Sequence, residues 1–490
     1  MLLLGIDLGT SSIKVSVVDS GTQRCIASAR HPEQEVAIRS LQTGWAEQSP
    51  EMWWHNIKGA IQKLIATQTF HAEDIRAIGI AYQMHGLVVV DRDQRVLRDS
   101  IIWCDSRAVG IGNEAYEHIG GQCCRDYLLN SPGNFTASKL GWVKRYEPEL
   151  YDKIDKIMLP GDFAAMKMTG EISTTRSALS EGIFWDFKNS AVSTDVMRYF
   201  NFSMDILPPV RDVFCSHGTL LPEVASELGL TPGIPVSYKA GDQLNNAVSL
   251  KVFEPGEVAA TAGTSGVIYA VTDKLFSDEH SRVNAFAHVN HAAGHTRLGV
   301  LLCINGAGIM NRWTQQLTGA TYPEMNARAS KVDPGSDGLM IFPFGNGAER
   351  MLENKIAGAH ISEIDLNKHS PAHLFRAVQE GIVYSFRYGL DIMRENGIEP
   401  TIIRAGRANM FLSDLFVDTF VNVTNVAVEL YKNDGSIGAA LGAGIGAGIY
   451  SSAADAFVNL KPERQIAPNE SVKLFSALYN KWRYELHKFI

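Results

Sequence analysis

Basic clusters are missing from this sequence. Lysine and arginine total 45 against 53 aspartate and glutamate residues, which gives a net charge of −8 over 490 residues. Nucleic-acid binding through phosphate charge requires a basic face, so the composition argues against a nucleic-acid partner. A phosphorylated small molecule is not excluded, because backbone N–H groups can bind phosphate without a basic field.

Paired cysteines and a leader segment are missing too. None of the six cysteines belongs to a Cys-x-x-Cys pair, and no histidine-rich segment lies near them. This pattern argues against a disulfide framework and a zinc site and predicts a reducing compartment, which we take to be the cytoplasm. Residues 1–7 carry no basic side chain and end on Asp7, so they do not have the pattern of a signal peptide.

The longest uncharged run contains few large apolar side chains. Residues 435–454 carry no charge over 20 positions, of which six are Gly and six are Ala. Small side chains contribute little free energy to membrane insertion. We therefore expect a tightly packed helix beside a Gly-rich loop, and no membrane partner.

Familiar catalytic motifs are also missing. The sequence has no Walker-type phosphate loop, no protein-kinase catalytic set, no His-Glu-x-x-His helix and no nucleophile elbow. The glycines of 442–448 do not open a βαβ unit with an acid at the right distance. They are therefore not a dinucleotide-binding fingerprint.

A repeated strand–turn–strand pattern is present instead. Apolar residues 2–6 and alternating residues 13–17 predict a hairpin whose turn contains Gly9-Thr10-Ser11. The same tripeptide returns as Gly263-Thr264-Ser265 between two further apolar runs. Three matching residues can arise by chance, but the shared context predicts two related lobes that divide near residue 250. The chain length fits two large lobes of this kind.

Helix signals lie between the predicted strands. Ser49-Pro50 and Ser370-Pro371 each combine an N-cap residue with a proline at the first helical position. The second pair is followed by apolar residues at helical spacing from Leu374 to Leu390. Further strands are predicted at 78–80 and 87–90, and the mixture predicts an α/β fold.

Four segments carry residues that suit phosphate or sugar chemistry, and each has a plainer explanation. Asp7 and Thr10 can serve a cation and a phosphate, or they can form an ordinary β-turn. His85 can contact a polyol, or it can be a loop histidine with satisfied hydrogen bonds. Asp242 follows a predicted strand and can be a general base or an N-cap. Residues 433–442 can admit a flat ligand or allow close helix packing.

In this order along the chain, these segments resemble the FGGY family of carbohydrate kinases, and within it the xylulokinases. The resemblance runs from about residue 3 to about residue 445. It rests on the segments 5–11, 44–48, 53–54, 83–86, 103–107, 159–162, 241–242, 263–266 and 435–442.

The resemblance implies two ribonuclease H-like lobes of the actin and hexokinase type that flank a central cleft. The N-terminal lobe, residues 1–248, would bind the sugar and carry the first phosphate hairpin and the catalytic acid. The C-terminal lobe, residues 249–490, would bind the nucleotide. The resemblance implies ATP and Mg²⁺ as cofactors and a sugar as the other substrate, and it allows for a homodimer.

The resemblance also implies roles for single residues. Asp242 matches the general base, and Asp7 matches an acid that serves Mg²⁺ through a water molecule. Met84 and His85 match the sugar-contacting pair of xylulokinases, with Asp242 and Gln243 completing the sugar site. Nucleotide contacts are implied at Gly9, Thr10, Ser11, Gly263, Thr264, Gly308, Gly406, Asn409 and Gly435.

The implied reaction is ATP-dependent phosphorylation of O5 of D-xylulose, which gives D-xylulose 5-phosphate and ADP. Two alternatives are a kinase of another ketose or polyol and a sugar or nucleotide sensor that has lost the chemistry. Where family members carry two or three glycines, residues 404–409 keep only Gly406, and Arg407 follows it. Arg407 would crowd the adenosine or stack on it. Gln243 also stands where an Asn is common.

Overall fold

The computed structural model describes residues 1–432 and 434–490, which form two compact units. Unit 1 comprises residues 1–251, 286–298 and 434–461, and unit 2 comprises residues 252–285, 299–432 and 462–490. Asn433, which the sequence placed in a polar turn, lies outside the described residues.

Unit 1 is built on a five-stranded mixed sheet. Its strands follow the order β13-β5-β1-β2-β3. Strand β1 pairs antiparallel with β2 and parallel with β5, and β5 pairs parallel with β13. The strand bounds are β1 (Leu2–Leu8), β2 (Ile13–Asp19), β3 (Cys25–His31), β5 (Ile75–Tyr82) and β13 (Val236–Gly241).

Unit 2 repeats this arrangement inside a seven-stranded sheet of order β16-β17-β15-β14-β20-β21-β22. Strand β14 pairs antiparallel with β15 and parallel with β20, which runs parallel to β21. The strands are β14 (Glu257–Ala262), β15 (Gly266–Thr272), β16 (Asn284–Ala287), β17 (Leu298–Ile304), β20 (Ile402–Gly406), β21 (Val428–Tyr431) and β22 (Arg464–Ile466). Both predicted hairpins are confirmed, and the matching strand orders give the repeated tripeptide a structural basis.

Helices pack on these sheets where the sequence predicts them. Helix α1 begins at Pro50, and the side chain of its N-cap Ser49 accepts a hydrogen bond from the Met52 N–H. Helix α13 begins at Pro371 and ends at Glu395, just before Gly397. The larger helices are α1 (Pro50–Ala66), α2 (Val109–Ile119), α4 (Thr136–Tyr146), α6 (Pro160–Thr169), α10 (Asp242–Ser249), α11 (Gly308–Thr318), α12 (Tyr322–Ala329), α13 (Pro371–Glu395), α14 (Asp414–Thr424), α15 (Gly435–Gly446) and α17 (Val472–Leu486).

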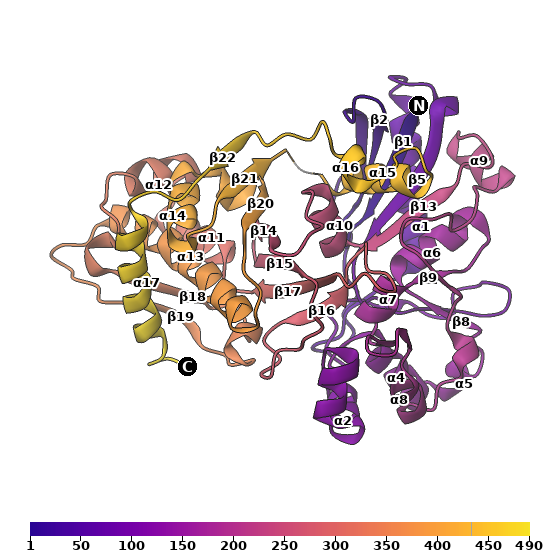
Figure 1. Cartoon of the computed structure of the whole chain (residues 1–490), viewed down its shortest axis with the longest axis horizontal. Helices are drawn as coiled ribbons and strands as arrows, with labels where there is room; N and C mark the ends of the chain where they lie inside the picture. The colour runs from indigo at the N-terminus through magenta and orange to yellow at the C-terminus, as the bar shows by residue number, and fades with distance from the viewer. Residues whose placement is uncertain (433) are drawn as a thin grey trace. The chain divides into compact units, whose positions relative to one another are not determined.

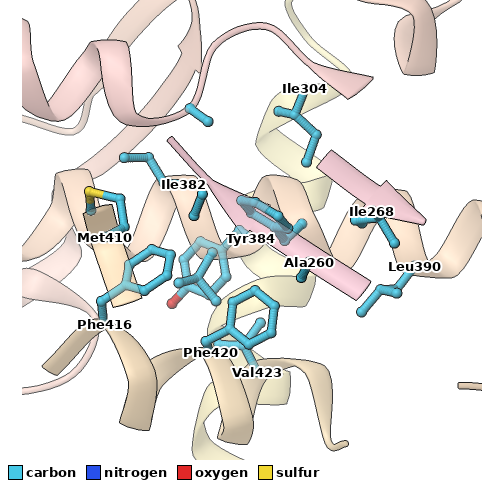
Figure 2. Close-up of a cluster of buried hydrophobic side chains, with 14 of the residues drawn as sticks. Ala260, Ile268, Ile304, Ile382, Tyr384, Leu390, Met410, Phe416, Phe420 and Val423 are labelled. Carbon is cyan, nitrogen blue, oxygen red and sulfur yellow. The ribbon is translucent and has the colours of Figure 1, made fainter. Parts of the chain in front are cut away.

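The core of unit 2 forms where α13 and α14 cover the sheet. Ile382 and Leu390 of α13 lie near Phe416 and Phe420 of α14 and Ile268 of β15, all in one buried cluster (Figure 2). The stripe predicted from Leu374 to Leu390 therefore faces the interior. Burial of this apolar surface provides most of the driving force for folding.

The uncharged run of the sequence forms α15, which packs against β1, β5 and β13 of unit 1 (Figure 1). A side chain at Gly5 would clash with the Ser436 carbonyl oxygen, and one at Gly79 would clash with the Ala439 carbonyl oxygen. Small residues on helix and strands thus allow backbone to approach backbone. The prediction of a tightly packed helix is confirmed. Among residues 1–432 and 434–490, no helix combines the length and apolar character needed to cross a bilayer.

Candidate functional site

The parallel strands of unit 1 bring three predicted site segments to one edge of the sheet. Asp7 lies near the carboxyl end of β1, Met84 and His85 follow β5, and Asp242 follows β13. In the strand registers, Asp7 is opposite Ala81 and Gly241 is opposite Tyr82. The carboxyl ends of parallel strands are where open α/β sheets bind ligands.

Asp242 is the first residue of α10, and Gly241 occupies the N-cap position. The alternative that Asp242 itself is the N-cap is therefore not borne out. Burial raises the pKa of Asp242 to about 6, although hydrogen bonds from Gln243 oppose the rise. The residue keeps part of its surface exposed. At pH 7 this carboxylate is ionised, accessible and basic enough to accept a proton from a hydroxyl group.

Asp7 lies in a cluster of negative charge. Burial, together with the charges of Asp242 and Asp434, raises its pKa to about 7, while Lys14 opposes the rise. Lys14 pairs with the Asp434 carboxylate. A Cβ atom at Gly435 would clash with Asp7 Oδ2, so only glycine lets the start of α15 approach this acid.

The turn of the first hairpin is tied to the segment after β5 that contains Met84 and His85. The Thr10 hydroxyl donates to Gln83 Oε1 over 3.1 Å and accepts from Trp103 Nε1 over 3.0 Å. The Thr10 carbonyl accepts from Gln48 Nε2 over 2.8 Å. Gly9 and Ser11 lie in the same turn, so these bonds fix the loop beside the acids.

Met84 and His85 are held by buried contacts. The His85 backbone is left-handed, with φ of 62°, which is uncommon for a residue with a side chain and recurs at functional sites. Its Nδ1 lies 3.0 Å from the Glu181 carbonyl oxygen, and its ring packs on Phe135. Lys139 donates to the His85 carbonyl over 2.9 Å. The ring of His85 is therefore fixed in position, and Met84 beside it is only 4% exposed.

Four of the predicted nucleotide residues line one cavity of about 330 Å³ in unit 2. Gly263 and Thr264 form the turn of the second hairpin, Gly308 begins α11, and Asn409 follows β20. The Gly308 N–H donates to the Gly263 carbonyl over 3.0 Å. A Cβ atom at Gly308 would clash with that carbonyl, so the hairpin and the helix meet without side chains between them. This cavity is at the lower end of the range for small-ligand pockets.

The segment that departs from the family pattern continues from β20. Gly406 is the last residue of this strand. Arg407 pairs with Glu463 over 3.4 Å, and its side chain is half exposed. The residues that line the cavity do not include Arg407. In this structure the Arg407 side chain thus does not crowd the cavity.

Several site residues escaped the sequence reasoning. Asn311 lines the unit 2 cavity, and its buried Oδ1 has no hydrogen-bond partner. Glu181 and Lys14 lie at the unit 1 site without belonging to any motif. The position of Asn311 one helical turn after Gly308 is the signal that could have revealed it.

Within the described parts of the chain, no group of three or more His, Cys, Asp or Glu side chains is arranged to hold a metal ion. Mg²⁺ commonly uses one or two carboxylates and completes its shell with water and substrate phosphates. The crowded negative charge around Asp7 fits a cation of this kind.

Comparison with known proteins agrees with this arrangement. The N-terminal domain of the FGGY family of carbohydrate kinases matches residues 2–249, and the C-terminal domain of that family matches residues 258–449. The chain belongs to the FGGY family of carbohydrate kinases. It is therefore a carbohydrate kinase with the two-lobe fold of the actin and hexokinase type, acting on a sugar and a nucleoside triphosphate.

Individual relatives of this FGGY kinase cover nearly its whole length. Xylulose kinase of Escherichia coli K12 is 31% identical over 94% of this chain and 93% of its own. The crystal structure of a xyloylose kinase from Brucella ovis aligns with a TM-score of 0.89 at 25% identity, covering 100% of both chains. A glycerol kinase from Plasmodium falciparum with ADP shares the fold, with a TM-score of 0.90 at 20% identity, covering 100% of this chain and 98% of its own.

Proposed function

We propose that this FGGY kinase transfers the γ-phosphoryl group of ATP to O5 of D-xylulose, giving D-xylulose 5-phosphate and ADP. The proposal rests on one observation: Asp242 lies next to the Met84–His85 pair at one edge of the unit 1 sheet. Full-length relatives named xylulose kinase support the choice of sugar.

Asp242 acts as the general base in this proposal. Its carboxylate accepts the O5 proton as O5 forms a bond to the γ-phosphorus, while the bond from phosphorus to the bridging oxygen of ADP breaks. The pKa of about 6 suits this task, because the group is ionised at neutral pH and still basic. Met84, His85 and Gln243 would hold the sugar so that O5 faces the carboxylate.

Unit 2 binds the nucleotide in the proposal. Thr264 and the backbone of Gly263 and Gly308 would contact phosphate oxygens, as small residues in a turn allow. Asn409 and Asn311 would offer polar contacts to the adenosine from the same cavity. Gly9, Thr10 and Ser11 would contact the transferred phosphoryl group from unit 1, and Gly406 and Gly435 would leave room for close approach of the ligand.

Asp7 would hold Mg²⁺ through a water molecule. When bound, Mg²⁺ neutralises charge on the phosphate oxygens. The side chains around Asp7 suit this role, since Asp434 and Asp242 add negative charge while Lys14 pairs with Asp434.

An assay of ADP release across a sugar panel tests the function. D-xylulose, D-ribulose, xylitol, glycerol and gluconate are compared by kcat/KM, with Asp242→Ala as the inactive control. The proposal expects the highest kcat/KM for D-xylulose and loss of turnover in Asp242→Ala. A higher kcat/KM for another sugar would indicate that the enzyme phosphorylates that ketose or polyol by the same mechanism. Tight sugar binding without turnover would indicate a sensor.

We also propose a cytoplasmic enzyme that forms a homodimer. The six cysteines are scattered and form no Cys-x-x-Cys pair, a pattern that suits a reducing compartment. Light scattering after gel filtration tests the assembly: twice the mass of one chain is expected, and the mass of a single chain would refute the dimer. Thiol labelling of protein from gently lysed cells tests whether the cysteines are reduced, as expected in the cytoplasm.

A further inference from the structure

A buried acid that the proposed mechanism does not use lies beside the sugar residues. Glu181 is the last residue of α7 (Arg176–Glu181) and is only 1% exposed. Its Oε1 accepts a hydrogen bond from the Tyr82 hydroxyl over 2.7 Å. Its Oε2 has neither solvent access nor a hydrogen-bond partner. One oxygen of this carboxyl group is therefore anchored, and the other has nothing to bind.

Three contacts place Glu181 at the sugar site. Its carbonyl oxygen lies 3.0 Å from His85 Nδ1. A Cβ atom built on Gly241 would lie 3.0 Å from Glu181 Oε2 and 2.7 Å from Met84 Cγ. Oε2 thus lies against the backbone that immediately precedes Asp242, beside the Met84 side chain. The unpaired oxygen points to the same residues that the sugar would contact.

The protonation state of Glu181 determines whether Oε2 can donate a hydrogen bond or only accept one. Burial raises the pKa of Glu181 well above its ordinary range, and the charges of Asp242 and Asp162 add to the rise, while the Tyr82 hydroxyl opposes it. Both causes favour the neutral form of Glu181, which does not repel the neighbouring Asp242 carboxylate. Because Oε1 accepts from Tyr82, the proton lies on Oε2. In this form the group is a buried O–H donor without an acceptor, an arrangement that destabilises the site without sugar.

We propose that Glu181 is a specificity-determining residue whose Oε2 hydroxyl donates a hydrogen bond to O1, O3 or O4 of the bound sugar. This inference rests on the sugar site proposed above. Met84 now lies beside Oε2, and its unbranched thioether can rotate aside for a ligand. A site that pairs a buried donor with a substrate oxygen strongly rejects sugars that lack that oxygen.

Two substitutions of Glu181 test the donor. Glu181→Met removes both carboxyl oxygens at similar length, and Glu181→Gln keeps a neutral side chain with an N–H donor. We expect Glu181→Met to raise the KM for D-xylulose ~10–100-fold, with kcat changed less than ~3-fold, as loss of one buried hydrogen bond predicts. The KM for ATP stays unchanged, and Glu181→Gln stays within ~5-fold of wild type.

Deoxy sugars separate recognition from a merely structural role. Wild-type enzyme is compared with Glu181→Met on 1-deoxy-, 3-deoxy- and 4-deoxy-D-xylulose. We expect one analogue to lose ~10–100-fold in kcat/KM with wild type and to lose little further with Glu181→Met. If Glu181→Met discriminates among all three analogues as the wild type does, the inference is overturned.

Infrared difference spectra of the wild type supply a readout that does not depend on the folding of Glu181→Met. The C=O band of the neutral carboxyl is identified by its loss in Glu181→Gln and is then followed as D-xylulose is added. A shift to lower frequency is expected when the O–H donates to the sugar. An unchanged band in sugar-saturated enzyme overturns the inference. A structure of the sugar complex in which only a water molecule pairs with Oε2 also overturns it. If the panel shows another preferred sugar, the xylulose assignment fails, whereas the same band shift with that sugar still upholds the role of Glu181.

Discussion

Replacing Asp242 by asparagine should inactivate the enzyme and stabilise its fold at the same time. The amide has nearly the same shape as the carboxyl group but cannot accept the O5 proton. A positioned general base contributes about 10²–10⁴-fold to a rate, so we expect kcat to fall by about that factor. The KM for D-xylulose should change little, since the amide still fills the site.

The gain in stability follows from the raised pKa. Burial moves the pKa of Asp242 from 3.8 to about 6, so the folded protein binds a proton more tightly than the unfolded chain does. Its contribution to the free energy of unfolding therefore falls as pH rises from about 4 to 6 and stays low above that. Ionising the group in the folded state costs at most about 3 kcal/mol, because each pH unit of pKa difference is worth ~1.4 kcal/mol and solvent reaches part of the residue. Asp242→Asn removes this cost at pH 8 and has nothing to remove at pH 4.

Denaturant unfolding of wild type and Asp242→Asn at pH 4 and pH 8 measures this difference. The variant should be more stable by up to about 3 kcal/mol at pH 8 and equal to wild type at pH 4. Asp93→Asn is the matched control, because Asp93 is an exposed acid of the same unit and its removal should change neither activity nor stability by much. A variant that is less stable at both pH values, or one that keeps its activity, would refute the reasoning.

Three further predictions test other parts of the structure. The kcat/KM for D-xylulose should fall at least tenfold per pH unit below pH 6, since Asp242 must be ionised; a flat profile from pH 7 down to pH 5 would contradict this role. Asn311→Leu should raise the KM for ATP ~5–30-fold by removing the unpaired oxygen from the unit 2 cavity. Arg407→Ala is the matched control and should leave the KM for ATP within ~2-fold, because Arg407 pairs with Glu463. If Arg407→Ala raised the KM for ATP more than Asn311→Leu did, the nucleotide would bind elsewhere. Gly79→Ala should destabilise the protein by ~2 kcal/mol or more, because the added Cβ atom would clash with the α15 backbone. Gly110→Ala is the control and should change stability by less than ~1 kcal/mol, because a Cβ atom there has no neighbour within 4 Å. Equal unfolding midpoints of the two variants would show that α15 does not need the close contact at Gly79.

Local patterns were enough to predict the framework of the fold. Alternating and continuous apolar runs predict the two hairpins, and Ser-Pro pairs predict where α1 and α13 begin. These signals work because each depends on neighbours in sequence. The pairing of β1 with β5 and of β5 with β13 depends on contacts between distant segments, so the sequence alone could not place Asp7, His85 and Asp242 at one edge.

The resemblance to a family supplied the roles that local patterns left open. Asp242 could equally have been an N-cap until the structure placed Gly241 in that position. Residues 435–442 could have admitted a flat ligand or allowed close helix packing, and the contacts of α15 with the strands of unit 1 show close packing. Glu181 and Lys14 belong to no motif, and their importance comes from burial and from charges that approach only in the folded chain. Glu181 stands out by an unpaired buried oxygen and Lys14 by its ion pair with Asp434, and neither feature is a sequence pattern.

The central claim is transfer of the γ-phosphoryl group to one sugar hydroxyl with Asp242 as the base. Phosphorus NMR of a reaction of wild-type enzyme with ATP, Mg²⁺ and D-xylulose tests it most directly. We predict one phosphate ester per ADP, coupled to the two protons on C5, and no such signal with Asp242→Asn. ADP formed with free inorganic phosphate, or an ester on another carbon, would contradict the account.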